Sequence, residues 1–331
     1  MKAKIIFAAN LLLGTGLLAF VLVRYGSPAL AILGAGVSIP TLAAFTVSVA
    51  MTIVSLSWRW GWILGGICTP PPLMRLTLYR SASHSLAALV PSGGISGDPL
   101  RAWFAVRDRV APGAAIASVA VDRTLELASS SPFSLVFAVL LLQHGIPQLE
   151  PVLVTVGVAT LGLVAGIAIA VRRLHRGTGL VAPLVRRMGL DRLRIIDRQM
   201  DVMAESDTAA AELIGRPRRM LVAFVAGLVA NLLVIVEFVV LLAAFGLPTE
   251  PTAVVAAIFA TGAAHMLPIP GGIGVLEGAN MWLFQLLGYP TEVGLAVGLA
   301  ARLRELIWML PGATYLLAGS LNKSLSEIRE T

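Results

Sequence analysis

The sequence is poor in cysteine and in charge, and each shortage excludes a class of protein. Cys68 is the only cysteine among 331 residues, which excludes an intramolecular disulfide and a metal centre built from several cysteines. Charged residues make up 13% of the chain, whereas a soluble domain is about a quarter charged. The hydrophobic share is 57% and the mean hydropathy is +0.86. These values predict an all-α polytopic membrane protein.

Apolar runs long enough to cross a bilayer recur along the chain, since a transmembrane helix needs roughly 20 such residues. The first run is longer than the core of a signal peptide and no clear cleavage site follows it, so we expect a membrane span there. Residues 28–37 are expected to form a short interfacial helix, and Trp58-Arg59-Trp60-Gly61-Trp62 an interfacial belt. Six full transmembrane helices are predicted at about 5–23, 38–57, 112–142, 151–171, 217–245 and 291–318.

The distribution of arginine predicts the orientation. Residues 172–219 hold 11 Arg and 6 acidic residues, whereas the loops at 143–150, 246–252 and 288–292 hold no Lys or Arg. By the positive-inside rule, the basic loop (172–216) and both termini are cytoplasmic. We expect one integral membrane domain over residues 1–320, followed by a short cytoplasmic tail at 321–331.

Part of the basic loop, residues 195–214, is predicted to form an amphipathic helix on the inner leaflet. Arginines in this loop would favour anionic lipid. A plain solvated helix face is the alternative.

A broken-helix phrase occurs in each half of the chain. Pro91-Ser-Gly-Gly-Ile-Ser-Gly-Asp-Pro-Leu-Arg101 and Pro268-Ile-Pro-Gly-Gly-Ile-Gly-Val-Leu-Glu277 each interrupt hydrophobic sequence. Paired interruptions of this kind point to the binding site of a transporter. Arginines flank the first phrase and base-free loops flank the second. We therefore expect two re-entrant hairpins of opposite orientation, at about 82–100 and 252–288. They would belong to an inverted repeat with halves at about 38–142 and 217–318.

Two short full spans are the alternative for the second hairpin, which makes six to eight spans in total. The glycines of both phrases allow positive φ and close backbone approach, and the helix ends after them favour anions. Tight turns between short helices are the other interpretation. The candidate substrate-binding glycines are Gly93, Gly94, Gly271, Gly272 and Gly274.

Arg123 and Arg302 each lie roughly 15 Å into a predicted span, near the middle of the bilayer. A charge at that depth costs about 2.5–3.5 kcal/mol, so it needs a partner. Glu126 and Glu305 follow three residues later on the same helix face. These four residues are candidate contacts for a lipid phosphate or carboxylate, and structural ion pairs are the alternative.

Further polar residues lie near these features. Asp98, Arg101 and Glu277 come just after the glycines, where they would either bind a headgroup or cap the following helix. Candidate proton or charge carriers are His84, His265, Asp122 and Glu237. A histidine bonded to a carbonyl of the broken helix is the alternative for the two imidazoles.

At these residues the chain resembles the lysylphosphatidylglycerol synthase/flippase transmembrane-domain family of bacteria and archaea. The resemblance extends from about residue 5 to 320, and Pro-Gly-Gly-x-Gly-Val-x-Glu is its most specific phrase. The segments 124–126 and 304–312 are also similar to the branch associated with hopanoid biosynthesis. The matching phrases lie at 89–101, 121–127, 270–278 and 302–305.

The resemblance implies a flippase that moves a polar or anionic lipid between the leaflets of the bacterial inner membrane. Nothing after residue 320 resembles the family's soluble aminoacyl-transfer domain, so synthase activity is not carried over. We expect no cofactor, no metal and no nucleic-acid partner, while enzymes of lipid synthesis are candidate partners. The alternative is a membrane enzyme, with Asp98 or Glu277 as its base, or an accessory subunit of lipid or lipid-linked glycan synthesis. A non-enzymatic role is the one we favour.

Overall fold

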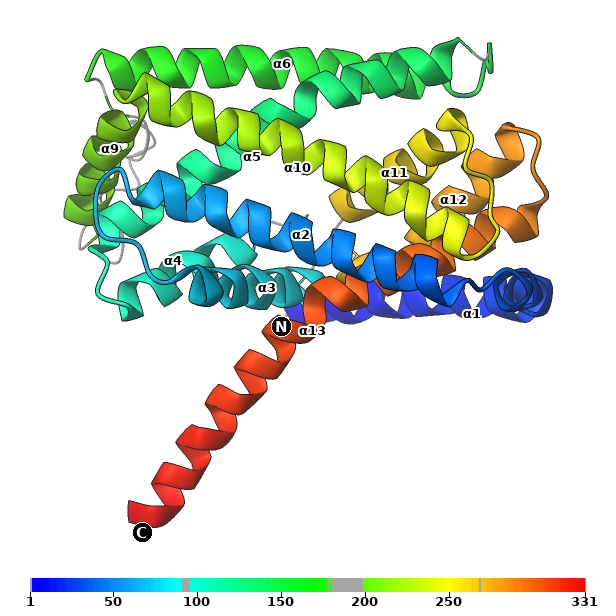
Figure 1. Ribbon diagram of the computed structural model, residues 1–331, viewed down its shortest axis with the longest axis horizontal. Coiled ribbons are helices and arrows are strands. Elements are labelled where there is room, and N and C mark those ends of the chain that lie inside the picture. The colour runs from blue at the N-terminus through cyan, green and yellow to red at the C-terminus, as the bar shows by residue number, and fades with distance from the viewer. Residues whose placement is uncertain are drawn as a thin grey trace. The chain divides into compact units, whose positions relative to one another are not determined.

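The computed structural model describes residues 2–90, 96–143, 145–177, 179, 199–267 and 269–330, and the elements in these ranges are helical (Figure 1). The predicted all-α polytopic membrane fold is confirmed. The helices are α1 (Lys2–Ala35), α2 (Ile39–Leu64), α3 (Leu73–Leu89), α4 (Gly97–Arg107), α5 (Pro112–Leu142), α6 (Glu150–His175), α9 (Met200–Ile214), α10 (Pro217–Ala244), α11 (Pro251–Met266), α12 (Val275–Leu286) and α13 (Thr291–Glu330), with a short 3₁₀ turn, η2 (Pro270–Gly272).

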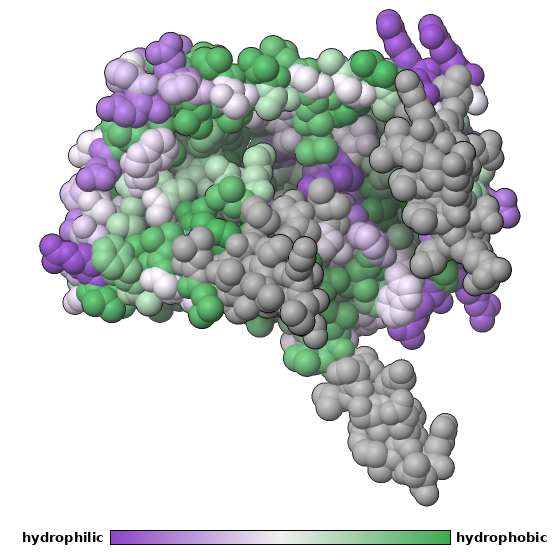
Figure 2. Space-filling view, turned by 180° about the vertical axis from the view of Figure 1, so that it is seen from behind, coloured by the Kyte–Doolittle hydropathy of each residue, from purple (hydrophilic) through white to green (hydrophobic). Residues whose placement is uncertain are grey.

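Five of the described helices are long and apolar enough to cross a membrane. They are the segment Thr15–Ala35 of α1, and α2, α5, α6 and α10. Three helices begin at a proline, Pro112, Pro217 and Pro251. Proline suits the first helical position because its missing N–H would have no partner there. Apolar side chains cover much of the coloured surface in Figure 2, as a lipid-facing surface requires.

One detail of the predicted spans is wrong, and one stays a prediction. Residues 28–35 do not form a separate interfacial helix, because α1 continues through Pro28 to Ala35. A proline inside a helix removes one backbone hydrogen bond, and the apolar turns on either side of Pro28 keep the helix continuous here. The predicted sixth span lies in α13, a helix of 40 residues. This helix is long enough to cross a bilayer but is not among the five apolar candidates of the described chain, so the sixth span stays a prediction.

The same order of helix lengths occurs twice in the chain. A long helix, two shorter helices and another long helix follow one another in α2–α5, with 26, 17, 11 and 31 residues. The order recurs in α10–α13, with 28, 16, 12 and 40 residues. The two broken-helix phrases occupy equivalent places, between the two shorter helices of each set.

The chain divides into two compact units. Unit 1 comprises 1–53, 78–97 and 232–331, and unit 2 comprises 54–77 and 98–231. Each long first helix, α2 and α10, contributes residues to both units.

In unit 1, α13 packs closely on α12 through a pair of glycines. A Cβ at Gly294 would lie 2.6 Å from the Cα of Met281, and one at Gly298 would lie 3.0 Å from the Cα of Glu277. Glycines four residues apart let two helix backbones approach each other closely in a membrane. Arg302, four residues after Gly298, therefore lies on the face of α13 that contacts α12.

Unit 1 also contains a polar contact at the proline of α13. The hydroxyl of Ser81 donates to the carbonyl of Trp308 at 2.5 Å and accepts from the N–H of Gly312 at 2.8 Å. A hydroxyl inserted in this way replaces a backbone hydrogen bond of α13 next to Pro311. It ties α3 to α13.

In unit 2, α9 packs against α5 and α6, and its Ser206, Ala210 and Leu213 are buried. The helix coincides with most of the predicted amphipathic segment at 195–214. It carries four acidic residues and no Lys or Arg. Any preference of the basic loop for anionic lipid therefore belongs to the arginines outside α9.

Candidate functional site

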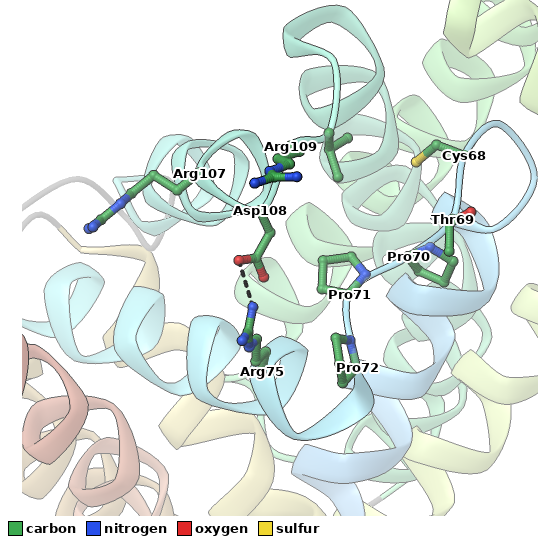
Figure 3. A pocket seen from close by; sticks show the side chains of 10 residues that line it. Cys68, Thr69, Pro70, Pro71, Pro72, Arg75, Arg107, Asp108 and Arg109 are labelled. Carbon is green, nitrogen blue, oxygen red and sulfur yellow. Dashed lines mark hydrogen bonds and ion pairs between the residues drawn. The ribbon is translucent and has the colours of Figure 1, made fainter.

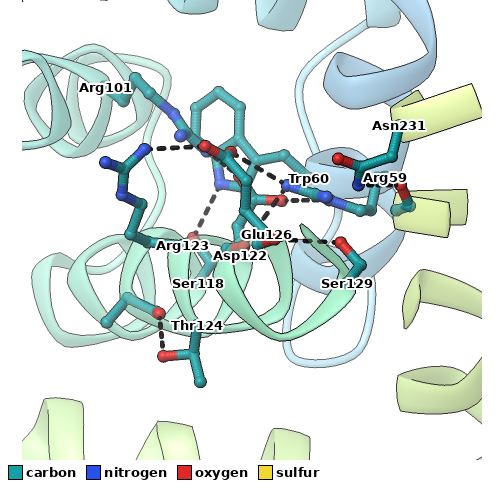
Figure 4. Close-up of polar contacts among 12 residues, drawn as sticks. Arg59, Trp60, Arg101, Ser118, Asp122, Arg123, Thr124, Glu126, Ser129 and Asn231 are labelled. Carbon is teal, nitrogen blue, oxygen red and sulfur yellow. Dashed lines mark hydrogen bonds and ion pairs between the residues drawn. The ribbon is translucent and has the colours of Figure 1, made fainter. Parts of the chain in front are cut away.

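Six charged residues of unit 2 form a connected set, which we call the first network, and Figure 4 labels five of them. At its centre, the carboxylate of Asp122 accepts a hydrogen bond from Nε of Arg59 at 2.8 Å and one from Nη2 of Arg101 at 2.6 Å. Both oxygens of this fully buried carboxylate are therefore paired with arginine. The members of the first network are Arg59, Asp98, Arg101, Asp122, Arg123 and Glu126.

The first network has three cations and three carboxylates, so its formal charge is zero. The guanidinium of Arg101 also lies 4.6 Å from the ring centre of Trp60, whose Nε1 donates to Ser118 at 3.1 Å. Buried charges of this kind are tolerated when each has a partner of opposite sign and further hydrogen bonds.

Arg123 differs from the other two arginines of the first network. It donates one hydrogen bond, from Nη1 to Glu126 at 2.7 Å. Its side chain is 35% exposed, compared with 1% for Arg59. Arg123 is therefore the cation of this network that keeps donors accessible to an anion.

The second network lies in unit 1 and is built around Arg302. Its guanidinium binds both oxygens of Glu277, at 2.7 and 3.0 Å, and one oxygen of Glu305 at 2.8 Å. It also donates to the carbonyl of Gly272 at 2.9 Å and to that of Gly271. These contacts engage all five N–H groups of a guanidinium. Arg302 therefore fastens the broken turn to α12 and α13. The members of the second network are His265, Gly271, Gly272, Glu277, Arg302 and Glu305.

The broken turn between α11 and α12 depends on glycine. Gly271, Gly272 and Gly274 have φ values of 57°, 57° and 78°, a region that costs other residues roughly 1–2 kcal/mol. This conformation directs the carbonyls of Gly271 and Gly272 at Arg302. The N–H of Gly274 donates to Glu277 at 2.9 Å, so Glu277 caps α12.

His265 joins the second network from α11. Its Nε2 lies 2.6 Å from Glu305, and its Nδ1 lies 2.7 Å from the carbonyl of Thr261. The imidazole is 38% exposed, whereas Glu277 is 1% exposed. His265 is thus the most exposed ionisable side chain of this network.

A separate buried ion pair in unit 1 links α10 to α13. Nε of Arg304 donates to Glu237 at 2.5 Å, and the guanidinium lies 5.6 Å from the ring centres of both Phe238 and Trp308. Glu237 is fully buried, and its other oxygen lacks a hydrogen-bond partner within the described part of the chain.

Most of the predicted site residues fall into these clusters. The ion pairs between Arg123 and Glu126 and between Arg302 and Glu305 form at the predicted spacing of three residues. His84 lies elsewhere in unit 1, with its ring 5.2 Å from that of Trp308. Gly93, Gly94 and the rest of 91–95 lie outside the described residues, as do Pro268 and His144.

Sequence reasoning missed Arg59 and Trp60 as members of a buried cluster. Both residues were predicted in an interfacial belt, and their side chains, 1% and 0% exposed, contact protein instead of the surroundings. α2 continues to Leu64 and turns Arg59 toward α5. An arginine beside a span boundary favours an interfacial position, and its partner Asp122 is 63 residues away in the sequence.

Comparison with known proteins gives the family. The lysylphosphatidylglycerol synthase TM region family matches residues 7–312. The chain belongs to this family and is a multi-pass helical membrane protein. No curated protein and no solved structure matches it.

Proposed function

We propose that this member of the lysylphosphatidylglycerol synthase TM region family moves a polar or anionic lipid between the leaflets of the bacterial inner membrane. The observation that carries the proposal is the state of Arg123. It is a cation inside an apolar candidate span, partly exposed, with one hydrogen bond within the first network. An intramembrane charge is by default a functional residue.

Arg123 suits a lipid headgroup because a guanidinium forms strong, often bidentate hydrogen bonds with phosphate or carboxylate oxygens. The neighbouring charges are balanced in pairs. An arriving anion would therefore compete with Glu126 for Arg123, while the carboxylate of Asp122 keeps both of its arginine partners. The other oxygen of Glu126 accepts from Arg59 at 3.3 Å. Glu126 is itself partly exposed, so the exchange can occur at the accessible edge of the first network.

In this proposal Arg302 acts differently from Arg123, although both were predicted as headgroup contacts. All five N–H groups of Arg302 are engaged while it donates to the carbonyls of Gly271 and Gly272, which we call the closed state. Arg302 can bind substrate only after it releases some of these contacts. In the closed state it holds the turn. Proton movement is assigned to the pair His265 and Glu305, with the buried Glu237 as a further carboxylate.

We further propose that α3/α4 and α11/α12 are re-entrant hairpins of an inverted repeat. The 16 residues of α11 and 12 of α12 correspond to about 24 and 18 Å of helix. Each length is less than the roughly 30 Å of a bilayer core. The repeated order of helix lengths supports the two halves.

Opposite orientation of the two hairpins is testable with single cysteines in a Cys68→Ser background. Val90 and Met266, next to the two broken phrases, are 39% and 80% exposed. Val90→Cys should react with an impermeant maleimide from the cytoplasmic side and Met266→Cys from the outer side. Reaction of both from one side would exclude opposite orientation.

The enzyme alternative has weaker support. Glu277 is buried, bonded to both Arg302 and the N–H of Gly274, and is poorly placed to take a proton from a substrate. Asp98 is more accessible, and it is paired with Arg101 at 3.5 Å. We therefore retain lipid movement as the proposal.

Reconstitution of the full chain into liposomes tests it. Leaflet-labelled phosphatidylglycerol, lysyl-phosphatidylglycerol and phosphatidylcholine should be compared with the same lipids in protein-free liposomes. We expect faster movement of at least one of these lipids. If all three lipids changed leaflet at the rate seen in protein-free liposomes, the proposed function would be contradicted.

A further inference from the structure

An open pocket of unit 2 lies outside both networks. We call it the proline pocket and define it as residues 68–72, Arg75 and residues 107–110 (Figure 3). Three successive prolines, at 70–72, form one wall, and the end of α4 forms the other. Prolines have no backbone N–H and a fixed φ, so this wall is rigid and leaves recognition to side chains of the opposite wall.

The charges of the proline pocket are not balanced. Arg75 pairs with Asp108 at 2.9 Å, through one nitrogen of its guanidinium. Arg109 lines the pocket beside this pair, as Figure 3 shows, and is exposed. Arg107 points away from the prolines and lies 4.8 Å from the ring centre of Trp103. The four charged residues of the pocket have a formal charge of +2; without Arg107, whose side chain points away, Arg75, Asp108 and Arg109 leave +1.

Arg109 has a backbone conformation that residues other than glycine rarely adopt. Val110 N–H bonds to the carbonyl of Ala105, and Arg109 N–H to that of Val106. This is the Schellman ending of a helix, in which the residue at the position of Arg109 adopts a left-handed conformation and is usually glycine. Arg109 has a φ of 65°, and among the described residues it is the only non-glycine with a positive φ.

Residues with strained backbones cluster at functional sites, and Arg109 combines such a backbone with an exposed guanidinium in a pocket. We propose that the proline pocket binds a phosphate group through Arg109 and Arg75. A net charge of +1 matches the single negative charge of a phosphodiester, and guanidinium groups are the preferred ligands of phosphate oxygens. The phosphate could belong to a lipid headgroup or to a free phosphate ion.

The pocket also has a connection to the first network through α4. Arg107 lies six residues after Arg101, about 9 Å along the helix. A phosphate held in the proline pocket would lie near the end of the helix that carries Arg101. The inference does not rest on lipid movement, since it concerns binding alone.

Cys68 supplies the measurement because it lines the same pocket and is the only thiol. The full chain in a maltoside detergent would be alkylated with a maleimide in two series. One series adds inorganic phosphate, with chloride at equal ionic strength as its control. The other adds short-chain phosphatidylglycerol, with diacylglycerol of the same chains as its control.

We expect severalfold slower alkylation in the presence of phosphate groups. Protection only by phosphatidylglycerol identifies a lipid headgroup as the ligand, and protection only by inorganic phosphate identifies the free ion. Protection in both series assigns the site to phosphate from either source. Equal rates with and without phosphate in both series would overturn the proposal.

Arg109→Gly separates binding from structure. Glycine relieves the left-handed strain, so the variant should melt at an equal or higher temperature and should lose the protection. Arg107→Gln should retain the protection, and Arg218→Gln, an exposed arginine of the same unit, is the matched control. Full protection in Arg109→Gly, or a lower melting temperature without loss of protection, would show that Arg109 serves only the end of α4.

Discussion

Nε2 of His265 lies 2.6 Å from Oε1 of Glu305, while Nδ1 of the same ring lies 2.7 Å from the carbonyl oxygen of Thr261. A carbonyl oxygen only accepts hydrogen bonds, so Nδ1 carries a proton. Nε2 and the carboxylate then need one further proton between them, held by either partner. The pair is thus a proton-holding unit at the accessible edge of the second network.

The first prediction concerns this unit. The cations Arg302 and Arg304 and the carboxylate of Glu277 also belong to its surroundings, so gain or loss of its proton changes a balanced set of charges. In His265→Gln the shared proton is lost while an amide remains to fill the space. We expect the translocation rate in liposomes to lose its dependence on pH.

His84→Gln is the comparison variant, because the ring of His84 lies 5.2 Å from that of Trp308 on the same unit. It should keep the wild-type pH profile. An unchanged pH profile in His265→Gln would show that the pair carries no transport proton.

The second prediction concerns the glycines of the broken turn. Gly271→Ala places a Cβ on a residue with a φ of 57° and should lower the free energy of unfolding by about 1–2 kcal/mol. Gly278→Ala, inside α12 and with ordinary van der Waals contacts, should raise it by about 1 kcal/mol. Thermal melting of both variants in detergent gives the comparison. Equal effects of the two substitutions would contradict the assigned conformation of the turn.

The third prediction concerns Arg302 as the residue that holds this turn. Arg302→Met leaves Glu277 and Glu305 buried without their cation and should cost about 3–5 kcal/mol. Arg302→Met combined with Glu277→Gln and Glu305→Gln removes the stranded charges and should recover part of the loss. The free energies of unfolding of the single and triple variants provide the measurement. If the triple variant were no more stable than Arg302→Met, the lost stability would come from the hydrogen bonds of Arg302 to the carbonyls of Gly271 and Gly272, and not from the stranded carboxylates.

The fourth prediction concerns Cys68, which lies in the loop after α2. Burial raises the pKa of its thiol above the ordinary value, since a charged thiolate is poorly solvated there. At any pH below that raised pKa the native protein has less thiolate than a free cysteine, and the thiolate is the reactive form. Maleimide alkylation should therefore reach half of its maximal rate at a higher pH in the native chain than in the denatured chain. A midpoint equal to that of the denatured chain would contradict the burial.

Much of the helical framework could be predicted from the sequence. Apolar length located α5 and α10 to within a residue, since a long apolar run is a local signal. The continuous α1 was not predicted, because Pro28 also signals a helix end. Whether Pro28 ends the helix depends on the helical turns that follow it.

The charged clusters were predicted only where partners are close in the sequence. Spacing alone indicated Arg123 with Glu126 and Arg302 with Glu305. The contacts of Arg59 with Asp122, of Arg302 with Glu277 and of Arg304 with Glu237 depend on helix packing, so the sequence carries no local signal for them. The assignment of roles to these residues stays a prediction.

Arg123 and Arg302 differ in how many of their N–H groups are engaged within the protein. One arginine keeps donors accessible and the other uses every donor to hold a turn. In the proposed function, substitution of Arg123 should therefore affect activity and substitution of Arg302 should affect folding.

Lipid translocation by Arg123→Gln in liposomes, measured beside its melting temperature, tests the central claim most directly. Glutamine keeps a polar side chain at the partly exposed position and removes the cation, and Arg218→Gln is the control for loss of an exposed arginine. We predict a melting temperature close to that of the wild type, because Arg123 has one hydrogen bond in the first network, together with loss of translocation. Wild-type translocation in Arg123→Gln, with the control also unchanged, would contradict the account.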